Sequence, residues 1–220
     1  MLGVDEDVDR RIILANLAFK SLEALWKHRD LVNERIRIMS YTTIVESVLL
    51  YNCSTWALSE SCAKRLDTAQ RRMLRRVIGI SMIDKMSNTE LYARCIITPA
   101  SLQVLHARWR MFGHALRLSE STPARKAMLY YFTQEANVVG RKGNFITIAT
   151  SLSKEYECIT KNNISNRIEY ERVLVHDNDH DLVNDIVQFY SNKYDNEVER
   201  RRLARHQAQE LRAYLAVSLD

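Results

Sequence analysis

The sequence predicts a mainly α protein, with a helical bundle over residues 1–137 and a looser, mostly helical region over residues 151–220. Three observations favour this fold class. The 220-residue chain has five glycines and two prolines, whereas all-β folds need many turns and usually more of both. Apolar residues recur at helical spacing through much of the chain. Helix-capping residues stand at the starts of several of these patterns.

The first two helices are predicted before residue 52. An acidic lead-in over residues 1–9 offers Asp7 or Asp9 as the cap of a helix that begins near Arg10. The apolar residues of this helix recur through residue 29. A second helix is predicted from about residue 31 to residue 51, with Tyr41 and Val45 on its apolar stripe.

The central helix is predicted to begin at Ser59 or Ser61 and to end near Gly79. Its apolar stripe advances by three or four residues at each step, as one face of an α-helix does. Glycine is the favoured residue just beyond a helix C-terminus. The members of the stripe are Cys62, Leu66, Ala69, Met73, Val77 and Ile80.

Cap signals predict the next helices. Ser87 and Glu90 have the spacing of a capping box, which precedes a short helix over residues 91–96. The pair Thr98-Pro99 has the pattern of an N-cap followed by a proline in the first turn. It opens a longer helix, on which Trp109 and Phe112 are expected to face the core.

Gly113 lies inside this longer helix, where glycine costs roughly 1 kcal/mol against alanine. We expect another helix or a backbone segment to approach closely at this position. The pair Thr122-Pro123 repeats the cap pattern and opens a helix through about residue 136.

The composition changes after residue 137. Residues 138–150 are a predicted linker that contains a basic, glycine-flanked loop at Arg141 and Lys142. Further helical patterns follow. The chain therefore divides into a helical domain (1–137), a linker (138–150) and a helical C-terminal region (151–220).

Positive charge is concentrated in residues 62–117. This stretch holds eleven Lys and Arg but three Asp and Glu, so it carries a net charge of +8, whereas the whole chain carries +5. Concentrated positive charge on helices indicates a polyanionic partner, because phosphate contacts need only Lys or Arg in an exposed row. The alternative is that these residues form a solvated face.

Other functional classes receive no support from the residues. The four cysteines are nine or more residues apart, so no C-x-x-C zinc pattern occurs, and we expect no metal or other cofactor. No spacing indicates a catalytic Ser-His-Asp or Cys-His site. The apolar run at residues 47–51 is far shorter than the ~20 residues that cross a bilayer. No signal peptide follows Met1, which predicts an intracellular protein, nuclear or cytoplasmic, with no membrane partner.

Several short blocks form an ordered series over roughly residues 1–145. They are Leu49-Leu50-Tyr51 with Thr55-Trp56, Arg65-Leu66, Gln70, Leu74-Arg75-Arg76-x-x-Gly79-Ile80-Ser81, Asn88, and Arg108-Trp109-Arg110-x-x-Gly113-His114-x-Leu116-Arg117. Together these blocks resemble the region that follows the polymerase palm in reverse transcriptases of non-LTR (LINE-type) retrotransposons. The corresponding family patterns are LLYG-x-x-TW, RL…Q…LRRILGIS, N-x-E and RWRWIGHxLR. Asn52 stands where the family usually has glycine.

The resemblance implies the thumb and adjoining linker of a reverse transcriptase, without the palm or the endonuclease. In that family the thumb holds the template–primer duplex through contacts with its backbone. The palm's metal-binding aspartates and its YADD-like sequence have no counterpart in this chain. The resemblance therefore implies no polymerase activity for the chain alone. It implies a non-catalytic protein that binds RNA, DNA or an RNA–DNA hybrid without sequence specificity.

We predict that the nucleic-acid contacts lie on the two basic helices and on the linker loop. Arg72, Arg75 and Arg76 are the main candidates, and His114 also fits a structural role. The alternative function is a helical interaction or structural protein that binds no nucleic acid. Its basic stripe would pair with an acidic partner or with the chain's own acidic C-terminal region. The full set of predicted contact residues is Arg65, Arg71, Arg72, Arg75, Arg76, Arg110, His114, Arg117, Arg141 and Lys142.

Overall fold

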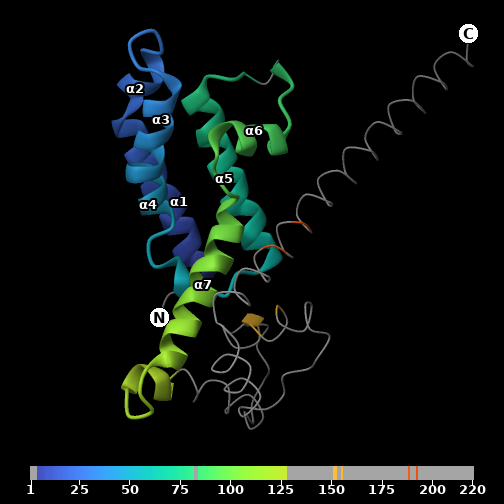
Figure 1. Ribbon diagram of the computed structural model, residues 1–220. Coiled ribbons are helices and arrows are strands. Elements are labelled where there is room, and N and C mark those ends of the chain that lie inside the picture. The colour runs from blue at the N-terminus through green and yellow to red at the C-terminus, as the bar shows by residue number, and fades with distance from the viewer. Residues whose placement is uncertain are drawn as a thin grey trace, which may run out of the picture.

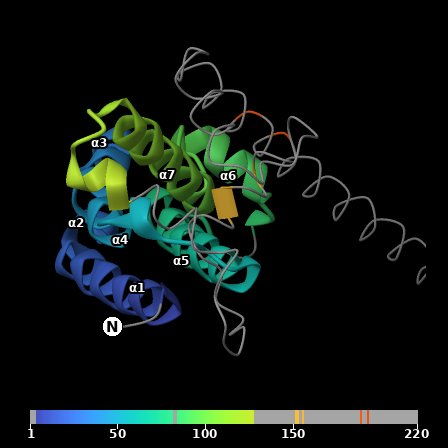
Figure 2. The same ribbon diagram turned by 90° about the horizontal axis from the view of Figure 1, so that it is seen from below.

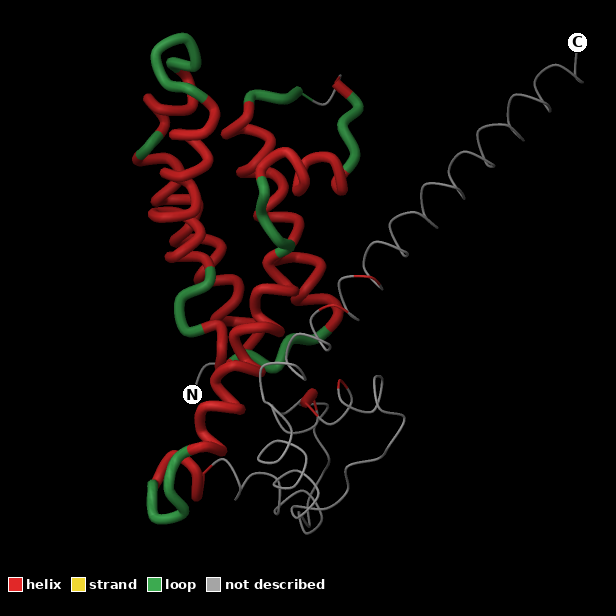
Figure 3. The backbone as a smooth tube through the Cα atoms, viewed as in Figure 1, coloured by secondary structure: helices red, strands yellow, loops and turns green. Residues whose placement is uncertain are grey.

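The structure, a computed structural model, describes residues 4–81 and 84–127, together with Ser151, Leu152, Glu155, Gln188 and Asn192. Within these residues every element is helical and no strand occurs, which confirms the predicted mainly α fold (Figures 1 and 3). The predicted linker 138–150 and nearly all of the region 151–220 lie outside the described residues. The elements are α1 (Val4–Ser21), α2 (Glu23–Lys27), α3 (Glu34–Ser40), the π-helix η1 (Tyr41–Glu46), α4 (Ser47–Leu49), the 3-10 helix η2 (Cys53–Thr55), α5 (Glu60–Ile78), α6 (Asn88–Cys95) and α7 (Ala100–Arg117).

The helix predicted through residue 29 is divided into α1 and α2 at Leu22. The indole of Trp26 lies back against α1. Its Nε1 donates a hydrogen bond to the Phe19 carbonyl oxygen at 2.9 Å, and the two rings stack with centroids 4.9 Å apart. Both side chains are buried. This contact holds the turn between the two helices, which the apolar periodicity does not reveal.

The helices α3, η1 and α4 form one continuous rod with a π-helical middle. Asn33 caps its start by accepting a hydrogen bond from the Ile36 N–H at 2.9 Å. A π turn bonds residue i to residue i+5, so it places Tyr41 and Glu46 on the same side, and both are buried. The predicted second helix is therefore helical, but its middle is wider than an α-helical pattern predicts.

The central helix of the bundle is α5. Ser59 caps its start by accepting from the Cys62 N–H at 3.2 Å, and Gly79 ends it at a φ of 81°, both as predicted. A β-carbon at Gly79 would also collide with the Arg29 guanidinium. The helix packs against α1, α3, α6 and α7, and its apolar stripe forms the core with side chains of the surrounding helices.

The helices α1 and α5 lie side by side and run in the same direction. Asp9 of α1 is paired with Arg65 near the start of α5, and Phe19 of α1 lies under Arg76 near the end of α5. In the view from below, α1 and α5 occupy one side of the bundle and α7 the other (Figure 2).

The start of α6 agrees with its prediction. Ser87 Oγ accepts from the Glu90 N–H at 3.1 Å, and Glu90 Oε2 accepts from the Ser87 N–H at 2.8 Å, which completes the capping box. At the other end, Ile96 is the C-cap in the left-handed conformation, with φ 54° and ψ 44°. A β-branched residue is an outlier there.

The start of α7 differs from its prediction. Pro99, rather than the threonine before it, occupies the N-cap position and gives no side-chain cap. The first N–H groups of the helix are bonded by side chains of α5 instead. Ala100 N–H donates to Gln70 Oε1 at 2.8 Å, and Ser101 N–H donates to Asp67 Oδ1 at 2.9 Å. The N-terminus of α7 is therefore capped from a neighbouring helix.

Farther along α7, Trp109 and Phe112 are fully buried, as predicted, and their rings meet edge to face at 5.9 Å. Gly113 is buried, but the close neighbour expected there is not found among the described residues. A β-carbon at Gly113 would meet Arg117 Nη1 at 3.6 Å, which is an ordinary contact, and no other helix or backbone of the described residues comes within 4 Å of it.

Candidate nucleic-acid interface

The outer face of α5 is basic. Because the opposite face of this helix packs into the core, Arg72 and Arg76 are exposed. No Asp or Glu occurs in residues 68–81. In the part of the chain that the structure describes, neither arginine forms an ion pair. The Arg76 guanidinium lies over the Phe19 ring, with Cζ 4.9 Å from the ring centroid, which orients it beside α1.

Arg65 and Arg71, on the same helix, have partners within the bundle. Arg65 donates from Nη1 to Asp9 Oδ2 at 2.8 Å and from Nη2 to the Cys62 sulfur at 2.9 Å. Arg71 donates to Thr68 Oγ1 at 2.9 Å. An exposed ion pair such as Arg65–Asp9 contributes only ~0–1 kcal/mol, so a polyanion could compete for Arg65.

Arg75 joins the end of α5 to the start of α6. Its Nη2 donates to Asn88 Oδ1 at 2.8 Å and to the Met86 carbonyl oxygen at 3.4 Å. Its side chain is half-buried, unlike those of Arg72 and Arg76. Arg75 is therefore primarily a structural contact, and less available to a ligand than its two neighbours.

The predicted residues of α7 form a separate set. Arg110, His114 and Arg117 are all exposed on this helix. Burial, and then the charge of Arg110, lowers the pKa of the neighbouring His106. The two remaining predicted residues, Arg141 and Lys142, lie outside the described residues.

The structure does not bring the α5 and α7 sets together. The helix α7 packs on the inner side of α5 and runs antiparallel to it, since Ser101 bonds to Asp67 and, farther along, Arg108 bonds to the Trp56 carbonyl just before α5. At a rise of 1.5 Å per residue, the two basic sets are roughly 20–35 Å apart along the bundle. In the view from below, α5 and α7 also lie on different sides of the bundle (Figure 2).

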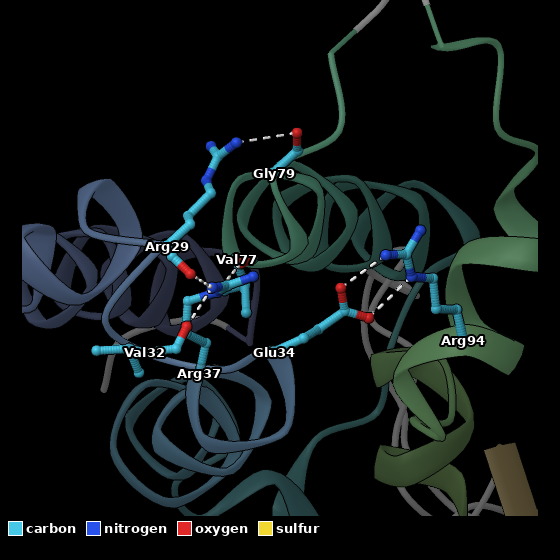
Figure 4. A network of polar contacts seen from close by, with 7 residues as sticks. All are labelled: Arg29, Val32, Glu34, Arg37, Val77, Gly79 and Arg94. Atoms are coloured by element: carbon cyan, nitrogen blue, oxygen red, sulfur yellow. Dashed lines mark hydrogen bonds and ion pairs between the residues drawn. The ribbon is translucent and has the colours of Figure 1, made fainter.

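Two arginines absent from the predicted set close the C-terminal end of α5 (Figure 4). Arg37 is buried, and its Nε donates to the Val77 carbonyl oxygen at 2.8 Å. Arg29 donates from Nη1 to the Gly79 carbonyl oxygen at 3.1 Å. The last carbonyls of a helix are the negative end of its dipole, so cationic side chains stabilise this end. Part of the chain's positive charge therefore has a structural role.

The sequence carried a signal for the buried arginine. Arg37 lies four residues before Tyr41, on the buried side of the same helical rod. Nearby, Arg94 of α6 donates to both carboxylate oxygens of Glu34 at 2.8 and 2.6 Å. The hydrogen bond from Arg94 lowers the pKa of Glu34. This pair connects α3 with α6.

A buried polar network surrounds Gln70, whose side chain is fully buried. Its Nε2 donates to Glu46 Oε1 at 2.8 Å, and its Oε1 accepts from the Tyr92 hydroxyl at 3.1 Å as well as from Ala100. Gln103 also donates to Glu46 Oε1, at 3.0 Å. Burial raises the pKa of Glu46, and the hydrogen bonds from the two glutamines partly oppose this shift. The network joins η1, α5, α6 and α7.

A second buried group attaches Glu155 to α7. Arg108 donates to the Trp56 carbonyl oxygen at 2.7 Å and to Glu155 Oε1, and Trp109 Nε1 donates to Glu155 Oε2 at 2.7 Å. Leu152 is fully buried and Glu155 nearly so. Burial raises the pKa of Glu155, which the charge of Arg108 opposes. Arg108 is thus a core residue.

Comparisons of the chain with protein-family models, with curated proteins and with solved structures found no match. Within the described residues, no three His, Cys, Asp or Glu side chains gather as the ligands of a metal ion would. None of the described helices combines the length and the apolar character that crossing a membrane requires.

Proposed function

We propose that the chain is a non-catalytic nucleic-acid-binding protein that contacts phosphates through the outer face of α5. The observation that carries this proposal is the pair Arg72 and Arg76. Both are exposed, one helical turn apart, on a surface without acidic residues from residue 68 to residue 81. Arginine contacts to phosphates give affinity without sequence readout, and that affinity falls steeply with salt.

Contacts between the sequence blocks support the related proposal that the bundle corresponds to a LINE-type reverse transcriptase thumb. Arg108 of one block donates to the carbonyl of Trp56 in another, and Arg75 donates to Asn88. Asn52, which stands where the family usually has glycine, adopts a φ of 59°. Glycine and asparagine both tolerate this left-handed conformation, so the substitution keeps the backbone path.

The test is binding of the purified chain to an RNA–DNA hybrid duplex at low and moderate salt. We expect salt-sensitive binding that weakens about tenfold when Arg72 and Arg76 are both changed to alanine. Each lost phosphate contact should lower the slope of log affinity against log salt by about 0.9. Parallel titrations with duplex DNA and single-stranded RNA would give the preference among nucleic acids.

The matched control is the double variant Arg110→Ala/Arg117→Ala, which removes the same charge from the separate basic set on α7. We expect it to retain nearly the parent affinity. Loss of affinity in this control, with unchanged binding by the α5 variant, would move the site to α7. Absence of binding at low salt would refute the proposed function for this chain.

The second candidate function is that of a helical interaction protein that binds no nucleic acid. It is favoured by two observations. Arg65 and Arg75 are engaged by partners inside the bundle, and two large aliphatic side chains of α1, the helix parallel to α5, are exposed.

A further inference from the structure

The outer stripe of α1 has two aliphatic residues flanked by two basic residues. Arg10, Ile13, Leu17 and Lys20 recur at steps of three, four and three residues, so they lie along one side of the helix. Ile13 is 61% exposed and Leu17 is 60% exposed, and both flanking basic residues are exposed. Two aliphatic side chains one turn apart are therefore presented to solvent between two cations.

The adjacent helix adds further positive charge to this stripe. Since α1 and α5 are parallel, Asp9 is paired with Arg65 and Phe19 lies under Arg76, the register places Leu17 and Lys20 at about the same level along the bundle as Arg72 and Arg76. Residues 10–22 of α1 and its exit contain no Asp or Glu, and neither do residues 68–81. The α1–α5 face, defined as these six residues, thus holds two aliphatic side chains between cations, and the exposed acids Glu6 and Asp9 lie before it, toward the N-terminus of α1.

We propose that the α1–α5 face docks an amphipathic helix of a partner protein, with an apolar stripe flanked by acidic residues. The steps of three, four and three residues are those by which one helix packs along another. The partner's apolar stripe covers Ile13 and Leu17, and its carboxylates pair with the cations on both sides. This inference does not depend on nucleic-acid binding, because aliphatic side chains contribute nothing to phosphate contacts.

The partner's character follows from complementarity of charge and of apolar area. A nucleic acid would use Arg72 and Arg76 and leave Ile13 and Leu17 in water. An anionic lipid surface would need a larger apolar area, since membrane binding scales with the apolar surface that is buried. A helix of about three turns (~15 Å at a rise of 1.5 Å per residue) matches the length of the stripe from Arg10 to Lys20.

The probe is a synthetic helical peptide of about 18 residues, with leucines at steps of three and four residues and glutamates on both flanks. Its binding to the full chain is measured by fluorescence anisotropy. We expect the double variant Ile13→Ser/Leu17→Ser to weaken binding about tenfold or more. The variant Arg72→Ala/Arg76→Ala should weaken it several-fold. The same peptide with lysines in place of glutamates should not bind.

The matched control is Leu31→Ser/Met39→Ser, which makes the same chemical change at exposed side chains outside this face. It should leave peptide affinity unchanged, and circular dichroism should show that all variants remain folded. Binding of the RNA–DNA hybrid should be unaffected by Ile13→Ser/Leu17→Ser, so failure of this inference is separable from failure of the proposed function.

Three results would overturn the proposal. The first is that the acidic peptide does not bind, or that it binds the Ile13→Ser/Leu17→Ser variant as tightly as the parent chain. Another is equal weakening of hybrid binding by the Ile13/Leu17 variant, which would make these side chains part of the nucleic-acid site. The third is binding to anionic lipid vesicles that depends on Ile13 and Leu17 while the peptide does not bind.

Discussion

Gln70 connects four elements through one fully buried amide, so its replacement gives a direct test of how the bundle is held together. Leucine at this position would have about the same volume but no polar atoms. The Ala100 N–H would lose its acceptor at the N-terminus of α7, and Glu46 and Tyr92 would each lose one hydrogen bond. Nothing apolar would be gained in return, because the partners are polar.

The expected loss can be estimated from these bonds. A buried polar group that loses its partner costs about 1–3 kcal/mol, and bonds to charged groups are at the upper end of that range. With the Ala100 N–H unpaired and the Glu46 carboxyl deprived of one of its two amide donors, Gln70→Leu should lower the free energy of unfolding by about 3–5 kcal/mol. The control Gln103→Leu removes a half-buried amide that water can partly replace, and should cost about 1 kcal/mol.

The charged variant Gln70→Glu adds a dependence on pH. Its carboxyl can still accept from Tyr92 and Ala100, but it would face the carboxyl of Glu46 where an amide donor was. Burial already raises the pKa of Glu46, and a second carboxyl would raise it further. The folded state would then hold a proton that the unfolded state releases above its ordinary pKa near 4.5. Stability is therefore present at low pH and lost as pH rises through the folded pKa.

Urea unfolding followed by circular dichroism, at about pH 5 and about pH 8, measures both effects. Between these two pH values, we expect the free energy of unfolding of Gln70→Glu to fall by about 2–3 kcal/mol more than that of the parent chain. Each unit of pKa shift corresponds to about 1.4 kcal/mol. A Gln70→Leu variant within about 1 kcal/mol of the parent, or a Gln70→Glu variant without added pH dependence, would refute the reasoning.

Two further changes test other features of the bundle. Ile96→Gly should raise the free energy of unfolding by about 0.5–1 kcal/mol, because Ile96 is 91% exposed and holds a left-handed conformation that glycine adopts without strain. A lower stability of this variant in urea unfolding would contradict the prediction. Glu155→Ala should lower the free energy of unfolding by about 3–5 kcal/mol, because the buried Arg108 guanidinium would lose its counter-charge, and Trp109 emission should change. A loss below about 1 kcal/mol would show that the contacts of Glu155 with Arg108 and Trp109 are not required for stability.

Features decided within one turn of helix were predictable from the sequence. The start of α5 at Ser59, its end at Gly79 and the capping box at Ser87 and Glu90 all depend on residues at most three or four positions apart. The apolar stripe of α5 likewise follows from the helical period, and most of its members are buried. The boundaries and the buried side of these elements could therefore be predicted without knowing the rest of the fold.

Features decided by distant residues were not predictable. Arg65 and Arg72 look equivalent along α5, yet Arg65 is paired with Asp9 of α1, whereas Arg72 forms no ion pair among the described residues. Arg75 and Arg76 are neighbours in sequence, but Arg75 bonds to Asn88. Whether an arginine is available to a ligand thus depends on which helix lies beside it, and a single sequence does not carry that information.

The separation of the two basic sets has the same cause. Helical spacing places Arg110 and Arg117 on one side of α7, but it does not say which way that side faces in the bundle. The apolar side of α7 is buried in the bundle, where this helix packs on α5, so its exposed basic side is turned away from α5. A row of phosphates can therefore follow one set or the other, and the proposal selects the set on α5.

The cap of α7 by α5 has a consequence for the order in which the helices form. The helix α6 carries its own capping box, so its first N–H groups can be hydrogen-bonded by nearby residues before the rest of the chain has folded. The first N–H groups of α7 can be hydrogen-bonded only after α5 has formed, because Asp67 and Gln70, which accept these bonds, lie on α5. Helix nucleation is the unfavourable step, so we expect α7 to fold after α5 and as one unit with it. The amides of Ala100 and Ser101 should then exchange with solvent at the rate of the whole bundle rather than as a fraying helix end.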